Sequence, residues 1–408
     1  MKRILRWAAL IMGALAALVG AAALFVEVRG IPRYTPARVE VSVRSTPEAI
    51  ARGRKFASML CSGCHLDPAT GAFSGRWMTD LPPQFGTAYA ANITRDPVNG
   101  IGAWTDGEIV YLLRTGVRRD GRYAPPWMPK LPHLSDGDLL SIVAFLRSDD
   151  PWVRPSPTPT QASRPSFLAK ALANTVFKPL PYPRAGVAAP DPKDRVALGR
   201  YLVAGLDCYG CHSADFKKMN ILEPERSEGF MGGGNEMLGA GGRPIVTANL
   251  TPDPETGIGR WTEEQFGRAL RQGLRPDDAP LRPPMRRFAE LTAEEAGAIY
   301  AYLRTVPPIR RARPAASPPA APAPASEGER VYRRHACGAC HGDDGSGPIA
   351  LKEAWRKYGT DAELAERIRR PTRFVPDTQM PTWDGVIAEA EYAPLAAYVR
   401  SLGAPAAR

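Results

Sequence analysis

The chain has 408 residues, which is long enough for two to four domains that each bury a core. Hydrophobic residues make up 44% of it and aromatic residues 8%, as in ordinary soluble globular domains. The formal net charge is +11, but the sequence contains no DNA- or RNA-binding motif. The basic balance therefore does not indicate a nucleic-acid partner.

The N-terminus indicates where the protein works. Three basic residues precede a charge-free run of 20 residues from Trp7 to Val26. As a helix this run spans about 30 Å, the thickness of a bilayer core, and the preceding charges favour export of everything after it. A cleaved signal peptide with a small-residue site at 21–23 is the alternative, although its apolar region is usually shorter, about 7–15 residues. We expect residues 1–28 to be a transmembrane anchor or signal, followed by a tether over 29–45.

One five-residue pattern occurs three times. It reads C-x-x-C-H at residues 61–65, 208–212 and 337–341, and it uses all six cysteines and three of the five histidines. Two thiols at this spacing share one side of a helix, where they can form thioethers to one porphyrin while the histidine ligates the iron. A redox dithiol or half a zinc site would not require that histidine three times. The pattern predicts three covalently bound haem c groups, attached through Cys61, Cys64, Cys208, Cys211, Cys337 and Cys340 and ligated by His65, His212 and His341.

The first two motifs belong to a longer repeat. Residues 91–97, Ala-Asn-Ile-Thr-Arg-Asp-Pro, recur 157 residues later as Ala-Asn-Leu-Thr-Pro-Asp-Pro. The cysteine motifs are only 147 residues apart, so the second unit carries ten extra residues, which we place within 219–242. Both Asn-x-Thr triplets fit a glycosylation sequon, but their identical place in the repeat favours a role in the structure of the loop.

The helices and linkers follow from local signals. A helix begins at Thr46 and Pro47 and runs up to Cys61, a capping box at Thr105 opens a second helix, and a third spans about Ser135 to Arg147. The second unit repeats this plan, and the third is shorter. We expect haem domains over 46–150, 191–311 and 327–408, separated by a linker over 151–190 and a Pro/Ala-rich linker over 312–326 that behave as extended spacers.

Methionines are the candidates for the second iron ligand. Met128 and Met285 each lie 24 residues after a repeated tryptophan and behind a double proline, and Met380 lies in the corresponding loop of the third unit. A methionine most often fills a core, but this shared register favours ligation. His133 is a weaker competitor, and His335 lies too close to the third motif to reach the opposite face of its haem. The predicted axial ligands are His65 with Met128, His212 with Met285, and His341 with Met380.

Two further pairs of repeated residues have two interpretations each. Trp104 and Trp261 are either partners of a haem propionate through the indole N–H or ordinary core tryptophans. Arg114 and Arg271 are either propionate partners or solvated surface arginines.

These residues resemble the class I cytochrome c family, whose order of C-x-x-C-H, loop, methionine and C-terminal helix covers all three units. The resemblance implies an all-α fold with three class I cytochrome c domains in tandem after one N-terminal transmembrane helix. In the third unit Gly345-Ser346-Gly347-Pro348 is similar to the family's loop after the motif, which implies that the Pro348 carbonyl accepts the His341 N–H.

The tri-haem layout and the Asn-x-Thr loop are similar to the cytochrome subunit of membrane-bound bacterial alcohol and gluconate dehydrogenases. This implies an electron carrier with no catalytic residues of its own. The N-terminal anchor departs from that family, and it is the apolar run at 7–26 that predicts anchoring in the bacterial inner membrane with the haem domains in the periplasm. The carrier's partners would be a dehydrogenase subunit, and an oxidase or quinone, within a respiratory chain. The alternative is a haem enzyme of the di-haem peroxidase type, which needs one open iron with acid–base residues beside it.

Overall fold

The computed structural model describes residues 2–79, 81–125, 127–239, 244–311, 324–347, 349–375 and 378–403. The described residues are mostly helical, with two short antiparallel strand pairs. They form two compact units, Met1–Ala188 with the first C-x-x-C-H motif and Ala189–Arg408 with the other two. The expected helical class is confirmed, whereas the division into three tandem domains stays a prediction.

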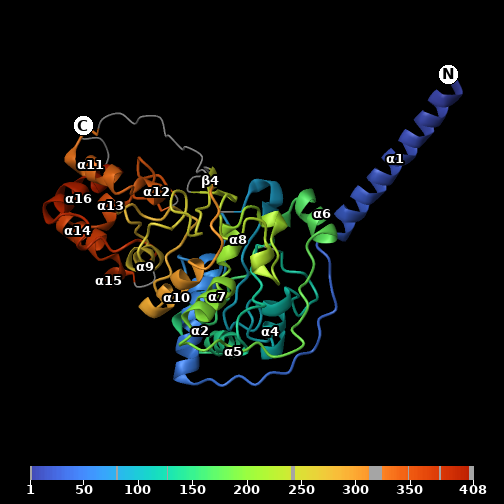
Figure 1. Ribbon diagram of the computed structural model, residues 1–408, viewed down its shortest axis with the longest axis horizontal. Coiled ribbons are helices and arrows are strands. Elements are labelled where there is room, and N and C mark those ends of the chain that lie inside the picture. Colours follow the sequence, from blue (N-terminus) through green and yellow to red (C-terminus); the bar gives the residue numbers. More distant parts are fainter. Residues whose placement is uncertain are drawn as a thin grey trace. The chain divides into compact units, whose positions relative to one another are not determined.

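Helix α1, Lys2–Arg29, is long and apolar enough to cross a membrane, and the first unit buries none of its apolar stretch. Figure 1 shows it projecting from the rest of this unit. A signal sequence near the N-terminus can also form an apolar helix long enough to cross a membrane, so residues 1–28 fit an anchor or a signal.

The first unit consists of short elements that connect two crossed helices. Its helix starts follow the predicted caps: Thr46 accepts a hydrogen bond from the Ala49 amide, and Thr105 forms a complete capping box with Glu108. After α1 its elements are α2 Pro47–Leu60, α3 Ser62–His65, η1 Pro83–Phe85, β1 Gly86–Thr87, α4 Asp106–Thr115, α5 Asp136–Leu146, η2 Pro151–Val153, β2 Arg164–Pro165 and α6 Phe167–Thr175.

The second unit repeats the helix order α2, α3, α4, α5 and then adds the shorter third-motif region. Its elements up to the second linker are α7 Arg195–Gly205, α8 Cys208–His212, η3 Phe216–Lys218, η4 Pro224–Arg226, β3 Glu236–Leu238, β4 Pro244–Val246, α9 Glu263–Gln272 and α10 Ala293–Leu303. The third-motif region contains α11 Glu327–Arg334, α12 Gly338–His341, α13 Ala354–Lys357, α14 Asp361–Arg369, α15 Pro371–Phe374, η6 Glu389–Glu391 and α16 Tyr392–Ser401.

Each motif is positioned by the same crossing of two helices, α2 with α5, α7 with α10, and α11 with α16. A glycine lies at each contact. A methyl group on Gly53 would lie 1.8 Å from the Ser141 carbonyl oxygen, one on Gly199 1.9 Å from that of Ala298, and one on Gly328 2.0 Å from that of Pro394. The absence of a side chain is therefore what lets the paired backbones approach.

Residues 151–188 differ from the extended spacer expected for 151–190. Trp152 and Val153 are buried, and the Trp152 carbonyl accepts a 2.6 Å hydrogen bond from the Phe73 amide. Strand β2 pairs with β1 in antiparallel register, Gly86 opposite Pro165. The composition suggested a spacer, but these contacts make the segment part of the first unit. Of the second linker, residues 312–323 lie outside the described part of the chain.

The tether after α1 also packs on the first unit. The Tyr34 amide donates to the Gly121 carbonyl at 2.8 Å, and the Tyr123 amide donates to the Pro32 carbonyl at 3.1 Å. These bonds fix the end of α1 to the body that holds the first motif.

The insertion in the second unit can now be placed. Gly75 donates its amide to the His65 carbonyl and Gly233 donates to that of His212, so these two glycines are equivalent. Gly75 follows its histidine by 10 residues and Gly233 by 21. The extra residues thus lie between His212 and Gly233. This segment includes the earlier part of the predicted stretch 219–242 and begins a few residues before it.

Candidate haem-binding sites

The three motif histidines share one arrangement. Their Nδ1 atoms lie 2.7 Å from the Ala91 carbonyl oxygen for His65, 2.8 Å from that of Ala248 for His212, and 2.7 Å from that of Ile349 for His341. Burial lowers the pKa of all three imidazoles, which favours the neutral form. A neutral imidazole that donates Nδ1–H to a carbonyl has Nε2 as its metal-binding nitrogen.

The Asn-x-Thr triplets build the loops that present two of these carbonyls. Asn92 Oδ1 accepts hydrogen bonds from the Thr94 amide at 2.9 Å and from its hydroxyl at 2.7 Å, and Asn249 holds Thr251 at the same two distances. Only 2% of Asn92 and 8% of Asn249 is exposed. The predicted structural role is confirmed, and Ala91 and Ala248 are the acceptors that sequence reasoning missed. Their position directly before the repeated asparagine was the available signal.

In the third unit a shorter loop brings a backbone carbonyl to the motif histidine. Gly347 donates its amide to the His341 carbonyl, as Gly75 and Gly233 do for theirs. Pro348, the expected acceptor of the His341 N–H, lies outside the described residues. The carbonyl found at Nδ1 belongs to Ile349, one residue further along.

The cysteines have the environment of attachment sites and not of reactive dithiols. None of the six forms a disulfide, and the His65 amide donates to the Cys61 carbonyl at 2.9 Å, which is the helical spacing expected of the motif. Burial raises the pKa of the Cys208 and Cys337 thiols to about 12. A redox-active dithiol needs a lowered thiol pKa, so the raised values argue against that alternative in the second and third motifs.

The loops with the three candidate methionines are anchored identically. The amide three residues after each methionine donates to a carbonyl in the last turn of an earlier helix: Leu131 to Leu113 of α4 at 2.7 Å, Phe288 to Leu270 of α9 at 2.7 Å, and Trp383 to Arg369 of α14 at 3.0 Å, with α15 between α14 and Met380. The repeat predicted a shared register for Met128 and Met285, and the bond at Trp383 gives Met380 the same spacing from its anchored amide. The buried or half-buried histidines with Nδ1 on a backbone carbonyl fit a haem c group, and ligation by Met128, Met285 and Met380 stays a prediction.

Arg114 is not the solvated surface arginine that was one of its two predicted roles. Its side chain is 1% exposed, and Nη1 donates to the carbonyls of Leu131 at 2.6 Å and Leu134 at 2.7 Å, just after Met128. Nη2 pairs with Asp136 at 2.6 Å. Arg271 makes the equivalent contact through Nε, which donates to the Leu291 carbonyl at 2.7 Å. Both arginines hold the loop after a candidate methionine.

The two repeated tryptophans are half-buried, and His335 packs against a third tryptophan. Trp104 is half-buried, with the guanidinium groups of Arg118 and Arg119 over its ring at 5.8 and 5.9 Å from the centroid. Trp261 is likewise half-buried, so neither is a fully buried core residue. The His335 ring packs at 72° against Trp383, 5.4 Å between centroids.

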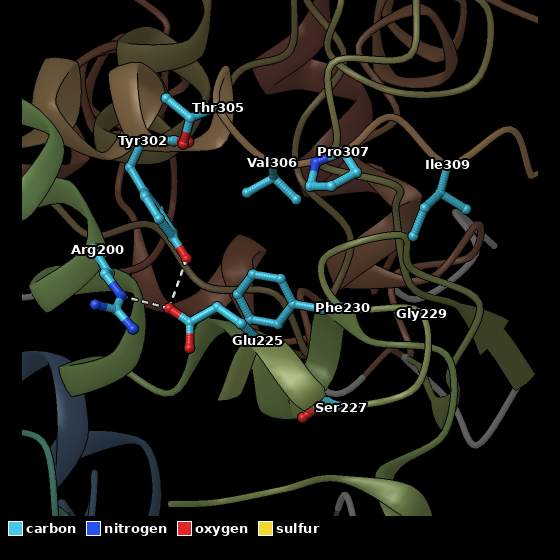
Figure 2. Close-up of a pocket in the computed structure, with 10 residues that line it drawn as sticks. All are labelled: Arg200, Glu225, Ser227, Gly229, Phe230, Tyr302, Thr305, Val306, Pro307 and Ile309. Atoms are coloured by element: carbon cyan, nitrogen blue, oxygen red, sulfur yellow. Dashed lines mark hydrogen bonds and ion pairs between the residues drawn. The ribbon is translucent and has the colours of Figure 1, made fainter. Parts of the chain in front are cut away.

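A pocket of about 580 Å³ lies in the second unit, lined partly by the insertion (Figure 2). Glu225 forms its polar wall and accepts hydrogen bonds from Arg200 Nε at 2.5 Å and from the Tyr302 hydroxyl at 3.0 Å. Burial alone would raise the pKa of Glu225, but the bonds from Arg200 and Tyr302 outweigh it and lower this pKa. The network satisfies its own polar groups and fastens the insertion to α7 and α10.

The comparisons with known proteins agree with this geometry. The family model described as cytochrome c oxidase, cbb3-type, subunit III matches residues 323–399. The chain contains a cytochrome c domain. Because that match covers the third-motif region, it supports haem c as a cofactor independently of the two repeated units.

Relatives match over much longer stretches. The chain is 29% identical over 378 residues to one of the subunits of nicotinate dehydrogenase from Pseudomonas putida, across 86% of this chain and 30% of that protein. It is 28% identical to the cytochrome c subunit of alcohol dehydrogenase (quinone) of Gluconobacter oxydans, across 74% and 65%. A dihaem cytochrome c-type protein of Cereibacter sphaeroides is 29% identical, across 72% of this chain and 97% of that protein.

The predicted resemblance is thus confirmed: the chain resembles the cytochrome c subunits of quinone-dependent alcohol dehydrogenases, and a gluconate 2-dehydrogenase cytochrome c subunit matches as well. It spans 30% of the length of the nicotinate dehydrogenase protein and about two thirds of the alcohol dehydrogenase cytochrome.

Proposed function

We propose that this protein is a membrane-anchored tri-haem c-type cytochrome that relays electrons from a periplasmic dehydrogenase to quinone or a terminal oxidase. Haem c would be attached at each motif, and α1 would hold the protein in the bacterial inner membrane. The single observation that carries the proposal is the threefold arrangement of a motif histidine with Nδ1 on a backbone carbonyl and a methionine loop bonded to an earlier helix.

The axial pairs in this proposal are His65 with Met128, His212 with Met285, and His341 with Met380. A bound haem supplies reversible one-electron chemistry at its iron. The chain's own residues attach the ring, orient the imidazole through the carbonyls of Ala91, Ala248 and Ile349, and hold the methionine loops in place. Closed, buried sites of this kind suit electron transfer and not the activation of a small molecule.

The partner is proposed from the relatives. Those named as cytochrome subunits belong to alcohol, fructose and gluconate dehydrogenases. We therefore place this chain beside a dehydrogenase subunit as its electron acceptor, without substrate chemistry of its own.

Two measurements test the haem sites. Intact mass after extraction of non-covalent haem should equal the polypeptide plus three haem masses, and a lower count in fully matured protein would contradict the tri-haem proposal. The oxidised protein should show the weak thioether-to-iron band in the far red, and it should not bind carbon monoxide. Stoichiometric carbon monoxide binding at one haem would mean an open iron and would favour the peroxidase-type alternative.

Replacement of the methionines assigns the sites one by one. Met128→Ala, Met285→Ala and Met380→Ala should each remove about a third of the far-red band and admit carbon monoxide at one haem, because each side chain fills one of three axial positions. Met59→Ala is a matched control in the first unit, since Met59 is buried in α2. It should leave the band intact, and a loss there would show that the band reports packing and not ligation.

A further inference from the structure

Helix α6, Phe167–Thr175, lies beside the C-terminal end of α1 (Figure 1). Lys170 forms an ion pair with Glu27 of α1, and Asn174 Nδ2 donates to the Gly30 carbonyl at 2.9 Å. These contacts hold α6 at the point where the apolar helix joins the first unit.

The two sides of α6 differ in exposure. Ala169 and Ala173 are 4% and 2% exposed and face the unit. At about 100° per residue, Phe167, Leu168 and Ala171 lie on the opposite side. Phe167 is 48% and Leu168 43% exposed, and Val176, directly after the helix, is 57% exposed. The helix thus presents an apolar face outward next to α1.

The charges around α6 are basic. The helix contains no acidic residue, and its one charged side chain, Lys170, is paired with Glu27. Exposed Arg29 ends α1, and exposed Arg164 and Lys178 lie just before and after α6. An apolar helix face flanked by cations is the pattern of a helix that lies in the interface of a bilayer containing anionic lipid.

We propose that α6 is an interfacial helix, seated in the outer surface of the bilayer where α1 emerges. This rests on the proposed membrane anchoring. Phe167 and Leu168 enter the boundary between headgroups and acyl chains, while Arg29, Arg164 and Lys178 remain among the lipid phosphates. The consequence is that the first haem unit is held at the membrane by two attachments, α1 and α6, and does not swing on a single tether.

The matured chain offers a clean way to test this. All six cysteines are consumed by the haem motifs in the proposed holoprotein, so an engineered cysteine is the only free thiol. Full-length Leu168→Cys is labelled with a nitroxide and placed in nanodiscs that contain phosphatidylglycerol. Val98→Cys is the matched control, because Val98 is an 85% exposed aliphatic side chain of the same unit.

The label at 168 should be accessible to oxygen and have lost access to an aqueous nickel chelate, whereas the label at 98 should remain open to the chelate. Equal chelate access at both positions would overturn the proposal. So would a label at 168 that is aqueous in nanodiscs and becomes protected only when a purified dehydrogenase partner is added, because α6 would then be a protein interface.

Failure of the anchor is distinguishable from failure of this proposal. If α1 is removed during export, the intact mass lacks the N-terminal segment and the protein does not enter nanodiscs, which overturns both. If α1 is retained and the label at 168 is aqueous, only the interfacial role of α6 is overturned. A haem spectrum identical to that of the unmodified protein shows that both labelled variants are folded.

Discussion

Arg114 shows how a single buried charge can position a ligand loop. Its guanidinium bonds the Leu131 and Leu134 carbonyls and Asp136, so Arg114→Met leaves buried acceptors without a donor. We expect a loss of about 3 kcal/mol in the stability of this region, and faster exchange of the amides that follow Met128. Hydrogen exchange followed by mass spectrometry measures this locally in the intact chain.

Arg271→Met is the matched comparison in the second unit. Arg271 makes one hydrogen bond, to Leu291, so the expected cost is only about 1 kcal/mol. A loss in the second unit as large as that in the first would show that the number of hydrogen bonds does not set the effect.

Asn92 acts on its iron site through the backbone. The side-chain nitrogen Nδ2 donates to the Ser156 and Thr158 carbonyls, both at 2.9 Å. The side-chain oxygen Oδ1 accepts a hydrogen bond from the Thr94 amide. Asn92→Ala should loosen the loop that carries the Ala91 carbonyl and weaken its bond to His65. A less strongly hydrogen-bonded imidazole is a weaker donor to ferric iron, so the potential of one haem should rise.

Redox titration of the variant measures this shift. Asn249→Ala should raise the potential of a different haem, through Ala248 and His212. If both substitutions shift the same haem, the assignment of one loop to each motif is wrong.

At the scale of elements, the crossing of α2 and α5 depends on Gly53. Gly53→Ala places a methyl group against the Ser141 backbone and should destabilise the first unit by about 1–3 kcal/mol, as overpacking does. Gly137→Ala in α5 is the control, because its added methyl group meets nothing closer than 4.0 Å. Its better helix propensity should stabilise the unit by up to about 1 kcal/mol. Thermal unfolding of both variants should give melting shifts of opposite sign, and shifts of the same sign would contradict this account.

The helices themselves could be predicted because their signals are local. Thr46, Thr105 and Ser135 cap helices through residues three positions away, and the structure begins each helix directly after them. The three crossing glycines also had a local signal, since each lies 12 or 13 residues before its motif histidine, but only the packed structure shows what they contact.

What the sequence could not provide are contacts between distant segments. The composition of 151–188 is that of a spacer, and its burial results from Trp152 and β2 packing on residues more than 70 positions earlier. Arg114 was ambiguous for the same reason, because a buried and a solvated arginine look alike until the carbonyls at 131 and 134 come into place. Met128 and Met285 were predicted as ligands from their shared position in the repeat. Met380 lies outside that repeat, and the bond from Trp383 to Arg369 shows that its loop is held in the same way.

At the scale of the whole molecule, the second unit joins two motif regions through their methionine loops. Leu274, at the end of α9, is fully buried in the hydrophobic cluster of the third-motif region. Arg287, two residues after Met285, donates from Nε to the Thr378 carbonyl at 2.9 Å and from its amide to the Gln379 side chain at 3.1 Å. The loop of one candidate ligand therefore rests directly on the loop of another.

Arg287→Ala should separate these loops. A charged donor contributes about 1.5–3 kcal/mol, and each 1.4 kcal/mol is tenfold, so exchange of the amides around 378–383 should rise about tenfold or more. Arg226→Ala is the charge-matched control, because Arg226 and its partner Glu223 lie outside both loops. Arg287→Lys keeps the charge but can form fewer of these bonds, so it should give an intermediate rate. Unchanged exchange in Arg287→Ala would mean that Leu274 and the backbone alone hold the two loops together. Equal effects of both alanine variants would mean that the loss of a positive charge, and not the loss of these hydrogen bonds, causes the faster exchange. A rise confined to Arg287→Ala would show that one side chain links the environments of Met285 and Met380.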